Sequence, residues 1–447
     1  MRIVIAGGGQ VGSSLARALA ASHEVFVIDH DPEVADVFQA MDVEFLVGSG
    51  TSEEVLGRAG IAQCDFFVAA TGLDEVNIVG CALASRLGRA ETVCLVSRPE
   101  FLGAAGTGGR LGAFGISRVV WPEAQLAADI ERIVTAPGAI DAEVFAGGIV
   151  RLLEYRLAAG SPLTATTLGG LRLPRGSLIV AVKRAGRIFV PRGSTRLQAA
   201  DKVIVMGTPE AMHAVEALLN PGRAGSRLLV TIIGGGDVGF QLAQRLEQTP
   251  SIDLRVLERD ADRGTMLAGR LSRTLVLNGD GTDLEFLESE NVGRSDVLVS
   301  VIDNDERNLL ASLLGRQLGV PKVITRVGRP ANLRLFERVG IDVAISARGA
   351  AVASILHHIT GGATSLLAIV EHGEARVFEL VVSPSFEPRE LKDMGAAEDA
   401  IVAAILRGNR AIVPRGDDRI EPGDRIVVFC TQDAADRVCT FFTGAAS

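Results

Sequence analysis

Aromatic residues are scarce in this sequence: they make up 4% of its 447 residues, with one Trp and one Tyr, whereas hydrophobic residues make up 47%. The cores must therefore be built from Val, Ile, Leu and Ala, which suits strands buried on both faces beneath helices. Long apolar runs are also missing, because no segment approaches the roughly 18 to 20 uncharged apolar residues that span a bilayer. Met1 leads straight into a predicted strand rather than a signal peptide, so we expect a cytoplasmic protein.

Neither an excess of basic charge nor a cysteine framework is present. The formal net charge is −9 and the sequence pI is about 5.4, so we expect no nucleic-acid partner. The five cysteines are odd in number, scattered and never in a CxxC pair, which predicts buried, reduced thiols and neither disulfides nor a zinc site. His357 and His358 are adjacent rather than one helical turn apart, and we predict no metal site.

The chain does contain a glycine-rich turn, and the turn occurs twice. Residues 2–12 read RIVIAGGGQVG, and residues 227–239 read RLLVTIIGGGDVG. Three further blocks of the first copy return in the second: FVIDHD at 26–31 as RVLERD at 255–260, GSGT at 48–51 as GDGT at 279–282, and DEVN at 74–77 as DERN at 305–308. A repeated turn with repeated downstream partners predicts two nucleotide sites in one chain.

Short apolar runs alternate with longer amphipathic stretches in each copy. In the first copy this pattern predicts strands near residues 2–6, 24–29, 44–47, 65–69 and 93–97, and helices near 11–21, 53–59 and 75–88. Such βαβ alternation implies a doubly wound parallel sheet. We therefore predict the α/β class, with two Rossmann-like domains.

A second repeat fills the gaps between the Rossmann units. VPRG at 190–193 returns at 413–416, each time between β-branched runs and followed by an Asp and a strand. This punctuation predicts turns in a small α+β module made mostly of strands. Residues 220–226 are the cleanest linker. We predict four alternating domains, at 1–135, 136–222, 223–360 and 361–447.

Each glycine turn stands between a predicted strand and a predicted helix, as the GxGxxG motif requires. Missing side chains let the backbone approach a phosphate, and the helix N-terminus supplies unpaired N–H donors. A tight turn without a ligand is the alternative for any single motif. The predicted contacts are Gly7, Gly8, Gly9, Gln10, Val11 and Gly12 in the first copy, and Gly234, Gly235, Gly236, Asp237, Val238 and Gly239 in the second.

An acidic residue follows each turn at the end of the next strand: Asp29 in the first copy and Glu258 in the second. A carboxylate in that place accepts both hydroxyls of an adenosine ribose and repels a 2′-phosphate, so NADP is disfavoured. NAD, ATP and ADP all carry both hydroxyls, and the carboxylate does not distinguish among them. The predicted cofactor is NAD(H), with ATP or ADP as the alternative.

Further polar residues are expected at the carboxyl edge of each sheet, where ligands of open α/β sheets bind. Thr51 and Thr71 are candidates for ligand contacts, with ordinary helix capping as the alternative reading. Asp74 and Asp305 are interpreted as helix N-caps.

Two arginines, Arg98 and Arg326, are expected to end the fifth strands and to bind phosphate, unless they are ordinary surface residues. Groups for hydride chemistry are missing, because no His, Lys or Tyr recurs near both turns. A dehydrogenase needs a proton donor or base beside the nicotinamide. We therefore predict no catalytic residues and a nucleotide that acts as a signal.

Together these motifs resemble the TrkA family of Trk system potassium uptake proteins, and the resemblance covers nearly the whole chain. Members have two RCK-type nucleotide-binding domains, also called KTN, each followed by an RCK-C domain. The resemblance implies a cytoplasmic subunit, peripheral to the inner face of the membrane, that binds NAD(H) and adenine nucleotides. It also implies a homo-oligomeric ring, a tetramer of two-RCK chains, beneath a TrkH-like potassium channel.

Carried over by motif, the family's nucleotide contacts are Gly7 to Val11, Asp29, Thr51, Thr71 and Arg98, then Gly234 to Val238, Glu258, Asp280 and Arg326. The copies differ, because Ser49 stands where the second copy has Asp280, and Ile302-Asp303 are taken to replace Ala70-Thr71. Residues 103–109 are too rich in glycine for a firm helix, whereas 332–338 keep a helical pattern. We expect the two sites to differ in affinity or ligand.

The main functional hypothesis is a ligand-gated regulator in which nucleotide binding moves the Rossmann units. The apolar segments 124–133 and 350–359 are candidate levers that pack between these units, unless each is simply the last helix of its own domain. The alternatives are an NAD-dependent oxidoreductase and a cytosolic regulator of another cation transporter.

Overall fold

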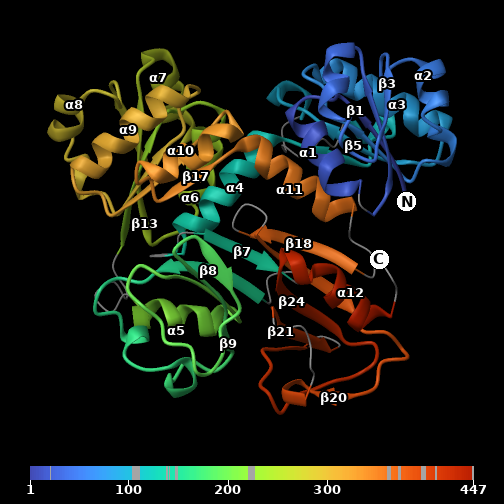
Figure 1. Ribbon diagram of the computed structural model, residues 1–447. Coiled ribbons are helices and arrows are strands. Elements are labelled where there is room, and N and C mark those ends of the chain that lie inside the picture. Colours follow the sequence, from blue (N-terminus) through green and yellow to red (C-terminus); the bar gives the residue numbers. More distant parts are fainter. Residues whose placement is uncertain are drawn as a thin grey trace.

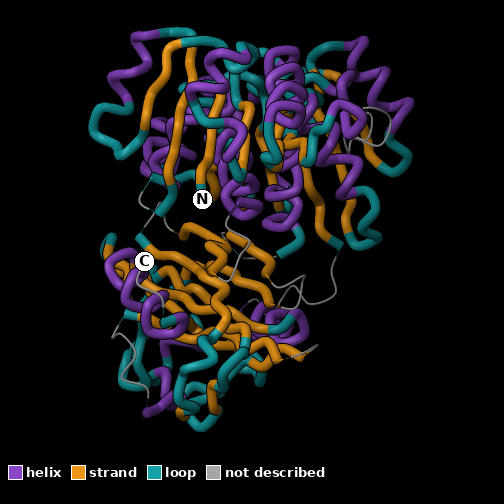
Figure 2. Tube along the Cα trace, turned by 90° about the vertical axis from the view of Figure 1, so that its right-hand side faces the viewer, coloured by secondary structure: helices purple, strands orange, loops and turns teal. Residues whose placement is uncertain are grey.

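The computed structural model places two large α/β lobes side by side, with two small modules beneath them (Figure 1; Figure 2). The expected linker at 220–226 and the glycine-rich segment at 103–109 lie outside the described residues. Within the described residues, no helix combines the length and apolar character needed to traverse a membrane. The structure describes the chain except for residues 21, 103–110, 137–138, 140, 146–149, 220–226, 360–363, 371–373, 394–398, 408–409 and 445–447.

The first lobe is a parallel sheet in the order β3-β2-β1-β4-β5-β6. Its strands are β1 (Arg2–Ala6), β2 (Glu24–Asp29), β3 (Glu44–Val47), β4 (Phe66–Ala69), β5 (Glu91–Leu95) and β6 (Arg118–Val120). The helices are α1 (Gln10–Leu19), α2 (Glu53–Arg58), α3 (Asp74–Leu87) and α4 (Pro122–Val134). The predicted Rossmann-like elements are confirmed to within a residue or two.

The second lobe repeats this sheet in the order β14-β13-β12-β15-β16-β17. Its strands are β12 (Leu228–Ile233), β13 (Ile252–Glu258), β14 (Thr274–Asn278), β15 (Val297–Ser300), β16 (Lys322–Arg326) and β17 (Val343–Ile345). The helical pattern at 332–338 forms α10. The helices are α6 (Asp237–Leu246), α7 (Ala261–Arg270), α8 (Leu284–Ser289), α9 (Asp305–Gln317), α10 (Leu333–Arg338) and α11 (Ala347–Ile359).

In its described residues each small module combines antiparallel strands with one α-helix and short 3-10 turns, which confirms the predicted α+β module. The first has the strand order β10-β9-β11-β8-β7 and the second β18-β19-β24-β21-β22, with β20 and β23 paired separately. The first comprises β7 (Asp141–Phe145), β8 (Val150–Arg156), β9 (Ser177–Arg184), β10 (Arg187–Phe189), β11 (Lys202–Gly207) and α5 (Pro209–Leu219). The second comprises β18 (Thr364–Val370), β19 (Ala375–Val381), β20 (Arg389–Glu390), β21 (Ala400–Arg407), β22 (Arg410–Ile412), β23 (Arg419–Ile420), β24 (Arg425–Thr431) and α12 (Ala435–Thr443).

An arginine–aspartate pair recurs in the two modules. Arg184 donates to Asp201 through Nε at 2.8 Å and Nη2 at 2.7 Å, and Arg407 meets Asp424 with the same distances. Both carboxylates are buried, so the bidentate geometry compensates for their lost hydration. The modules also pack against each other, because residues such as Leu152 of the first and Phe429 of the second share one buried cluster.

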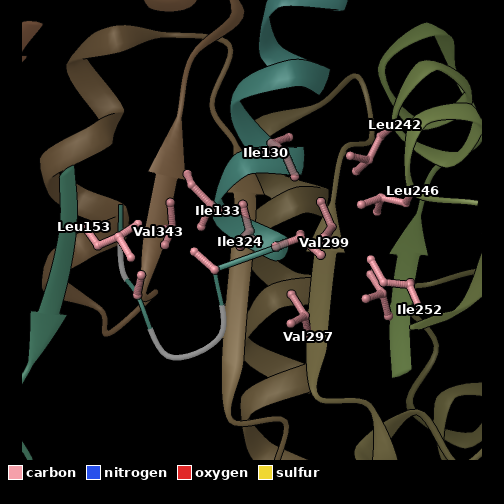
Figure 3. Packing of buried hydrophobic residues seen from close by; sticks show 14 of the residues in the cluster. Ile130, Ile133, Leu153, Leu242, Leu246, Ile252, Val297, Val299, Ile324 and Val343 are labelled. Carbon is pink, nitrogen blue, oxygen red and sulfur yellow. The ribbon is translucent and has the colours of Figure 1, made fainter. Parts of the chain in front are cut away.

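The last helix of each lobe covers the other lobe. Figure 1 shows α4 beside α6 and α11 beside α1. In Figure 3, Ile130 and Ile133 of α4 lie against Val299 and Ile324 of the second sheet. Ile355 of α11 lies in the buried cluster of the first sheet. The expectation that segments 124–133 and 350–359 pack between the lobes is confirmed, and the alternative, a helix confined to its own domain, is wrong.

Candidate functional site

The two glycine turns have the same strained geometry. Gly7 and Gly234 adopt φ values of +108° and +103°, a left-handed region that disfavours other residues. A Cβ added at Gly12 would overlap the carbonyl oxygen of Gly7, because helix and strand pack closely there. A Cβ at Gly9, by contrast, would meet nothing within 4 Å. The outer glycines therefore serve the fold, and the middle of the turn is open to a ligand.

The strand-end acids are fixed by the turns themselves. The Gly8 amide donates to Asp29 Oδ2 at 2.6 Å, and the Asp31 amide donates to Oδ1 at 3.0 Å. Glu258 receives equivalent bonds, from the Gly235 amide at 2.7 Å and from the Asp260 amide at 2.8 Å. Each carboxylate is thereby held beside its turn, and its oxygens keep further lone pairs for ribose hydroxyls.

A cavity of about 380 Å³ lies at the second turn. Predicted site residues that line it are Gly234, Gly236, Asp237, Val238, Glu258 and Arg326. The sequence prediction missed five charged residues of its wall: Glu123, Arg259, Asp303, Arg263 and Arg307. Arg259 and Arg263 follow Glu258 closely in sequence, so their proximity to the predicted acid could have identified them. Glu123 belongs to α4 of the first copy, and nothing in the local sequence linked it to the second site.

Asp280 is not among the residues that line the cavity, but its two neighbours in sequence, Gly279 and Gly281, are. Its Oδ1 accepts hydrogen bonds from Thr282 Oγ1 at 2.7 Å and from Arg307 Nη2 at 2.6 Å. Burial opposes the charge of Asp280, but the bonds from Thr282 and Arg307 outweigh burial and lower the pKa of the carboxyl. Asp280 thus orients Arg307 toward the cavity, and its own contact with a nucleotide stays a prediction.

The two candidate threonines of the first lobe are engaged locally. Thr51 Oγ1 lies 2.7 Å from Ser49 Oγ, and Thr71 Oγ1 donates to Asn77 Oδ1 at 2.7 Å. Ser52, not Thr51, caps α2, so the capping alternative is wrong for Thr51. Both hydroxyls lie at the carboxyl edge of the sheet, and their role as ligand contacts stays a prediction.

Asp74 and Asp305 are not the helix caps that the sequence suggested. Asn304 caps α9, and Leu73 precedes α3 without a side-chain cap. The two carboxylates instead bind the backbone after the fifth strand. Asp74 accepts from the Arg98 amide at 2.8 Å, and Asp305 accepts from the Arg329 amide at 3.3 Å. They therefore anchor equivalent loops.

These anchors also show that Arg98 and Arg326 are not equivalent. Arg98 lies beyond the end of β5, and its counterpart is Arg329; Arg326 ends β16, and its counterpart is Leu95. The pairing expected from sequence was wrong, because the sheet register and the DEVN and DERN blocks share one offset, 305 − 74 = 231 residues, which places Arg326 opposite Leu95.

The surroundings of the two arginines differ as well. Arg98 contacts the carboxylates of Asp74, Glu75 and Glu100 and lies 4.6 Å above the Phe101 ring. Arg326 pairs with Asp303 at 2.9 Å and lines the cavity. A phosphate contact for either arginine stays a prediction, and Arg98 would have to leave its acidic partners to make one.

One further pairing requires correction. The amides of Thr71 and Ile302 both donate to the equivalent asparagines Asn77 and Asn308, at 2.9 Å and 2.8 Å. Ile302 is therefore the counterpart of Thr71, and Asp303 is the counterpart of Gly72. The sequence comparison had placed Ile302-Asp303 one residue too early.

An inter-lobe cleft of about 810 Å³ separates the carboxyl edges of the two sheets. The first lobe contributes Gly9, Gln10 and Thr71, and the second contributes Arg326 and Arg348 among others. Arg348 Nη1 donates to Gln10 Oε1 at 2.6 Å across the cleft. Among the described residues that line this cleft or the 380 Å³ cavity, none is a His, Lys, Tyr or Cys.

Comparison with known proteins gives a consistent family. The TrkA-N domain model matches residues 3–122 and 230–347, and the TrkA-C domain model matches residues 152–220 and 377–443. The chain is 36% identical to Trk system potassium uptake protein TrkA homolog 1 of Methanosarcina mazei, over 99% of this chain and 100% of the relative. It is 31% identical to TrkA of Halomonas elongata, over 96% of this chain and 95% of the relative.

Solved structures share the fold. The crystal structure of the GsuK RCK domain aligns with a TM-score of 0.60 at 20% identity, over 97% of this chain and 93% of that chain. The GsuK channel bound to NAD aligns with a TM-score of 0.58 at 20% identity, over 98% and 78%. With two TrkA-N and two TrkA-C domains in alternation, this chain belongs to the TrkA family of Trk system potassium uptake proteins.

Proposed function

We propose that this chain is the cytoplasmic, nucleotide-binding regulatory subunit of a Trk-type potassium channel, held at the inner face of the membrane by a TrkH-like partner. It binds NAD(H), and ATP or ADP, at its two glycine turns and is not itself an enzyme. The observation that carries the proposal is the pairing of each turn with a strand-end acid, Gly8 with Asp29 and Gly235 with Glu258. The relatives' name as potassium uptake proteins supports the physiological role.

NAD is proposed as a ligand because the acids suit an adenosine ribose without a 2′-phosphate. The structural neighbour described as a channel bound to NAD supports this choice. The site we propose comprises the two glycine turns with Asp29, Thr51, Thr71 and Arg98 in the first lobe, and with Glu258, Asp280 and Arg326 in the second. The domain boundaries we propose fall at residues 135, 222 and 360.

The exchanged helices offer a route from ligand to channel. The α4 helix packs on the second lobe and leads into the first module, whereas α11 packs on the first lobe and leads into the second module. A ligand that binds one arrangement of the lobes more tightly than another would shift both helices and so move the modules. The ring assembly rests on the family resemblance alone.

Titration calorimetry on the full chain tests the ligand assignment. NAD, NADH, ATP and ADP are each measured against the wild-type chain, Asp29→Ala and Glu258→Ala, with Asp42→Ala as a control for loss of an exposed acid. We expect each site variant to lose about tenfold or more in affinity at one of two sites. If neither variant weakens any nucleotide, the site assignment is wrong.

A transport measurement tests the role. We expect potassium flux through a reconstituted TrkH-like channel to depend on this chain and on nucleotide. Steady oxidation or reduction of the nicotinamide would instead support an oxidoreductase, and co-purification with an antiporter would support a regulator of another cation transporter.

A further inference from the structure

The helices α4 and α11 begin with opposite charges at equivalent positions. They follow β6 and β17, which pair in the same register with β5 and β16. Glu123 is the second residue of α4, and Arg348 is the second residue of α11. These two residues are therefore structural counterparts, one an acid and the other a base.

Because α4 packs on the second lobe and α11 packs on the first, each of these residues lies beside the lobe of the other copy. Glu123 lines the cavity at the second turn, together with Gly236 and Asp237, and it also borders the inter-lobe cleft. Arg348 lies in the inter-lobe cleft beside the first turn, where it donates to Gln10 at 2.6 Å. The first lobe thus receives a cation from the second copy, and the second lobe receives a carboxylate from the first copy.

The same contrast extends to other positions near the two glycine turns. We call the part of the cleft beside Gly9 the first mouth and the part of the cavity beside Gly236 the second mouth. At four equivalent positions the lobes carry different residues, whereas the neighbouring anchor Asp74 and its counterpart Asp305 are alike. Over these four positions alone, the first set carries one charge, a positive one, and the second set carries three negative charges and one positive. Glu123, Asp303 and Arg326 of the second set also line the inter-lobe cleft. The four positions are Gln10, Gly72, Leu95 and Arg348 at the first mouth, and Asp237, Asp303, Arg326 and Glu123 at the second.

A nucleotide bound as the motifs predict would direct its far end toward these mouths. Asp29 and Glu258 mark the adenosine end, and the glycine turn takes the phosphates at the helix N-terminus. A group beyond the second phosphate then points to the cleft. That group is a third phosphate in a nucleoside triphosphate and a nicotinamide riboside in NAD.

Neither counterpart is neutralised within the protein in the way that Arg98 is. No carboxylate pairs with Arg348 among the described residues. Oε2 of Glu123 is buried and has no hydrogen-bond partner in the described part of the chain. Burial raises the pKa of Glu123; Asp237 and Asp303 raise it further, while Arg326 opposes them. Both groups are therefore available to a ligand.

We propose that Arg348 and Glu123 give the two lobes different ligand preferences. The first lobe, which holds Arg348, prefers a nucleoside triphosphate, whose terminal phosphate the guanidinium binds. The second lobe, which holds Glu123, excludes that phosphate and prefers a dinucleotide of the NAD type, whose nicotinamide amide is a hydrogen-bond donor to the carboxylate. This inference rests on the proposed function and adds a specificity to each of its sites.

Calorimetry on full chains with one intact site tests the first lobe. In Glu258→Ala, which leaves the first site, we expect ATP to bind more tightly than NAD. Adding Arg348→Ala should lower the affinity for ATP about tenfold and that for NAD by less than about threefold. Arg348→Lys, which keeps the charge, should retain the preference for ATP. Arg334→Ala, which removes an exposed arginine of α10, is the matched control and should leave both affinities unchanged.

The converse experiment uses Asp29→Ala, which leaves the second site. There we expect NAD to bind more tightly than ATP. Adding the isosteric Glu123→Gln should raise the affinity for ATP about fivefold to tenfold. Glu53→Gln, which also removes an acid from the first turn of a helix, is the control for helix stability and should change neither affinity.

The outcomes separate the two proposals. If both single-site chains bind nucleotides but Arg348→Ala and Glu123→Gln leave the ratio of ATP to NAD affinity unchanged, this inference is wrong and the proposed function stands. If the wild-type chain binds no nucleotide, both are wrong.

Discussion

Nζ of Lys322 donates a hydrogen bond of 2.6 Å to the carbonyl oxygen of Ile133, and a longer one of 3.4 Å to that of Ala136. Lys322 begins β16 of the second lobe, and Ile133 lies in the last turn of α4. A buried cation of one copy therefore holds the negative end of a helix from the other copy, just before the chain enters the first module.

Replacing this lysine should loosen the connection between lobe and module. Lys322→Met removes this donor from the Ile133 carbonyl oxygen, whereas the Ala136 carbonyl oxygen keeps the Ala139 amide at 3.1 Å. We expect the free energy of unfolding to fall by about 2 kcal/mol. Urea unfolding at pH 7 measures the change. Lys392→Met, which removes a half-exposed lysine from a surface ion pair, is the control and should cost little. Equal effects of the two substitutions would contradict a structural role for Lys322.

Two substitutions in the first glycine turn should separate an effect on nucleotide binding from an effect on stability. Gly9→Ala adds a methyl group that meets no protein atom within 4 Å, so the melting temperature should stay unchanged while nucleotide affinity at the first site falls about tenfold or more. Gly12→Ala drives a methyl group into the Gly7 carbonyl and should cost about 2 kcal/mol or more of stability. Calorimetry and thermal unfolding of both variants measure this contrast, and a destabilised Gly9→Ala would contradict the open turn.

The paired aspartates predict a loss of stability in acid. Burial opposes the charge of Asp201, but hydrogen bonds from Arg184 and the Gln198 amide outweigh burial and lower its pKa. A carboxyl whose pKa is lower in the folded state stabilises the fold above its unfolded pKa of about 3.9, and this contribution is lost as pH falls through the folded pKa. Asp201→Asn should therefore cost about 2 kcal/mol at pH 7. The difference from the wild-type chain should shrink toward pH 3, and urea unfolding at both pH values measures it.

Glu216 on α5 predicts the opposite trend. Burial raises the pKa of Glu216 to about 7 against the opposing charges of Arg151 and Lys322. A carboxyl whose pKa is higher in the folded state imposes no penalty below its unfolded pKa of about 4.5, and stability falls as pH rises through the folded value near 7.

Glu216→Gln should remove this penalty. We expect the variant to be more stable than the wild-type chain by about 2 kcal/mol at pH 8 and the difference to vanish at about pH 4, below the unfolded pKa. Thermal unfolding at the two pH values measures the effect, with the exposed Glu210→Gln of the same helix as control. A variant that is less stable at pH 8 would contradict the sign.

Most of each site could be predicted from the sequence, because its residues lie close together along the chain. A strand, a glycine turn and a helix are consecutive in sequence, so the positions of Gly7, Gly12 and Asp29 follow from the motif and the next strand. Asp74 was misread because an acid just before a helix looks like a cap, whereas its partners are amides more than twenty residues away. The pairing of Arg98 with Arg326 was wrong because the two arginines occupy different positions after equivalent strands, and Leu95 stands where the second lobe has Arg326.

The sequence by itself determined the duplicated Rossmann units, the alternating small modules and the two pairs of turn and acid, because each depends on neighbours along the chain. Only the tertiary structure decided which sheet each terminal helix covers. An apolar helix face requires burial but does not specify a partner, and long-range packing placed α4 on the second lobe and α11 on the first. That choice brings Glu123 to the cavity at the second turn and Arg348 beside the first turn.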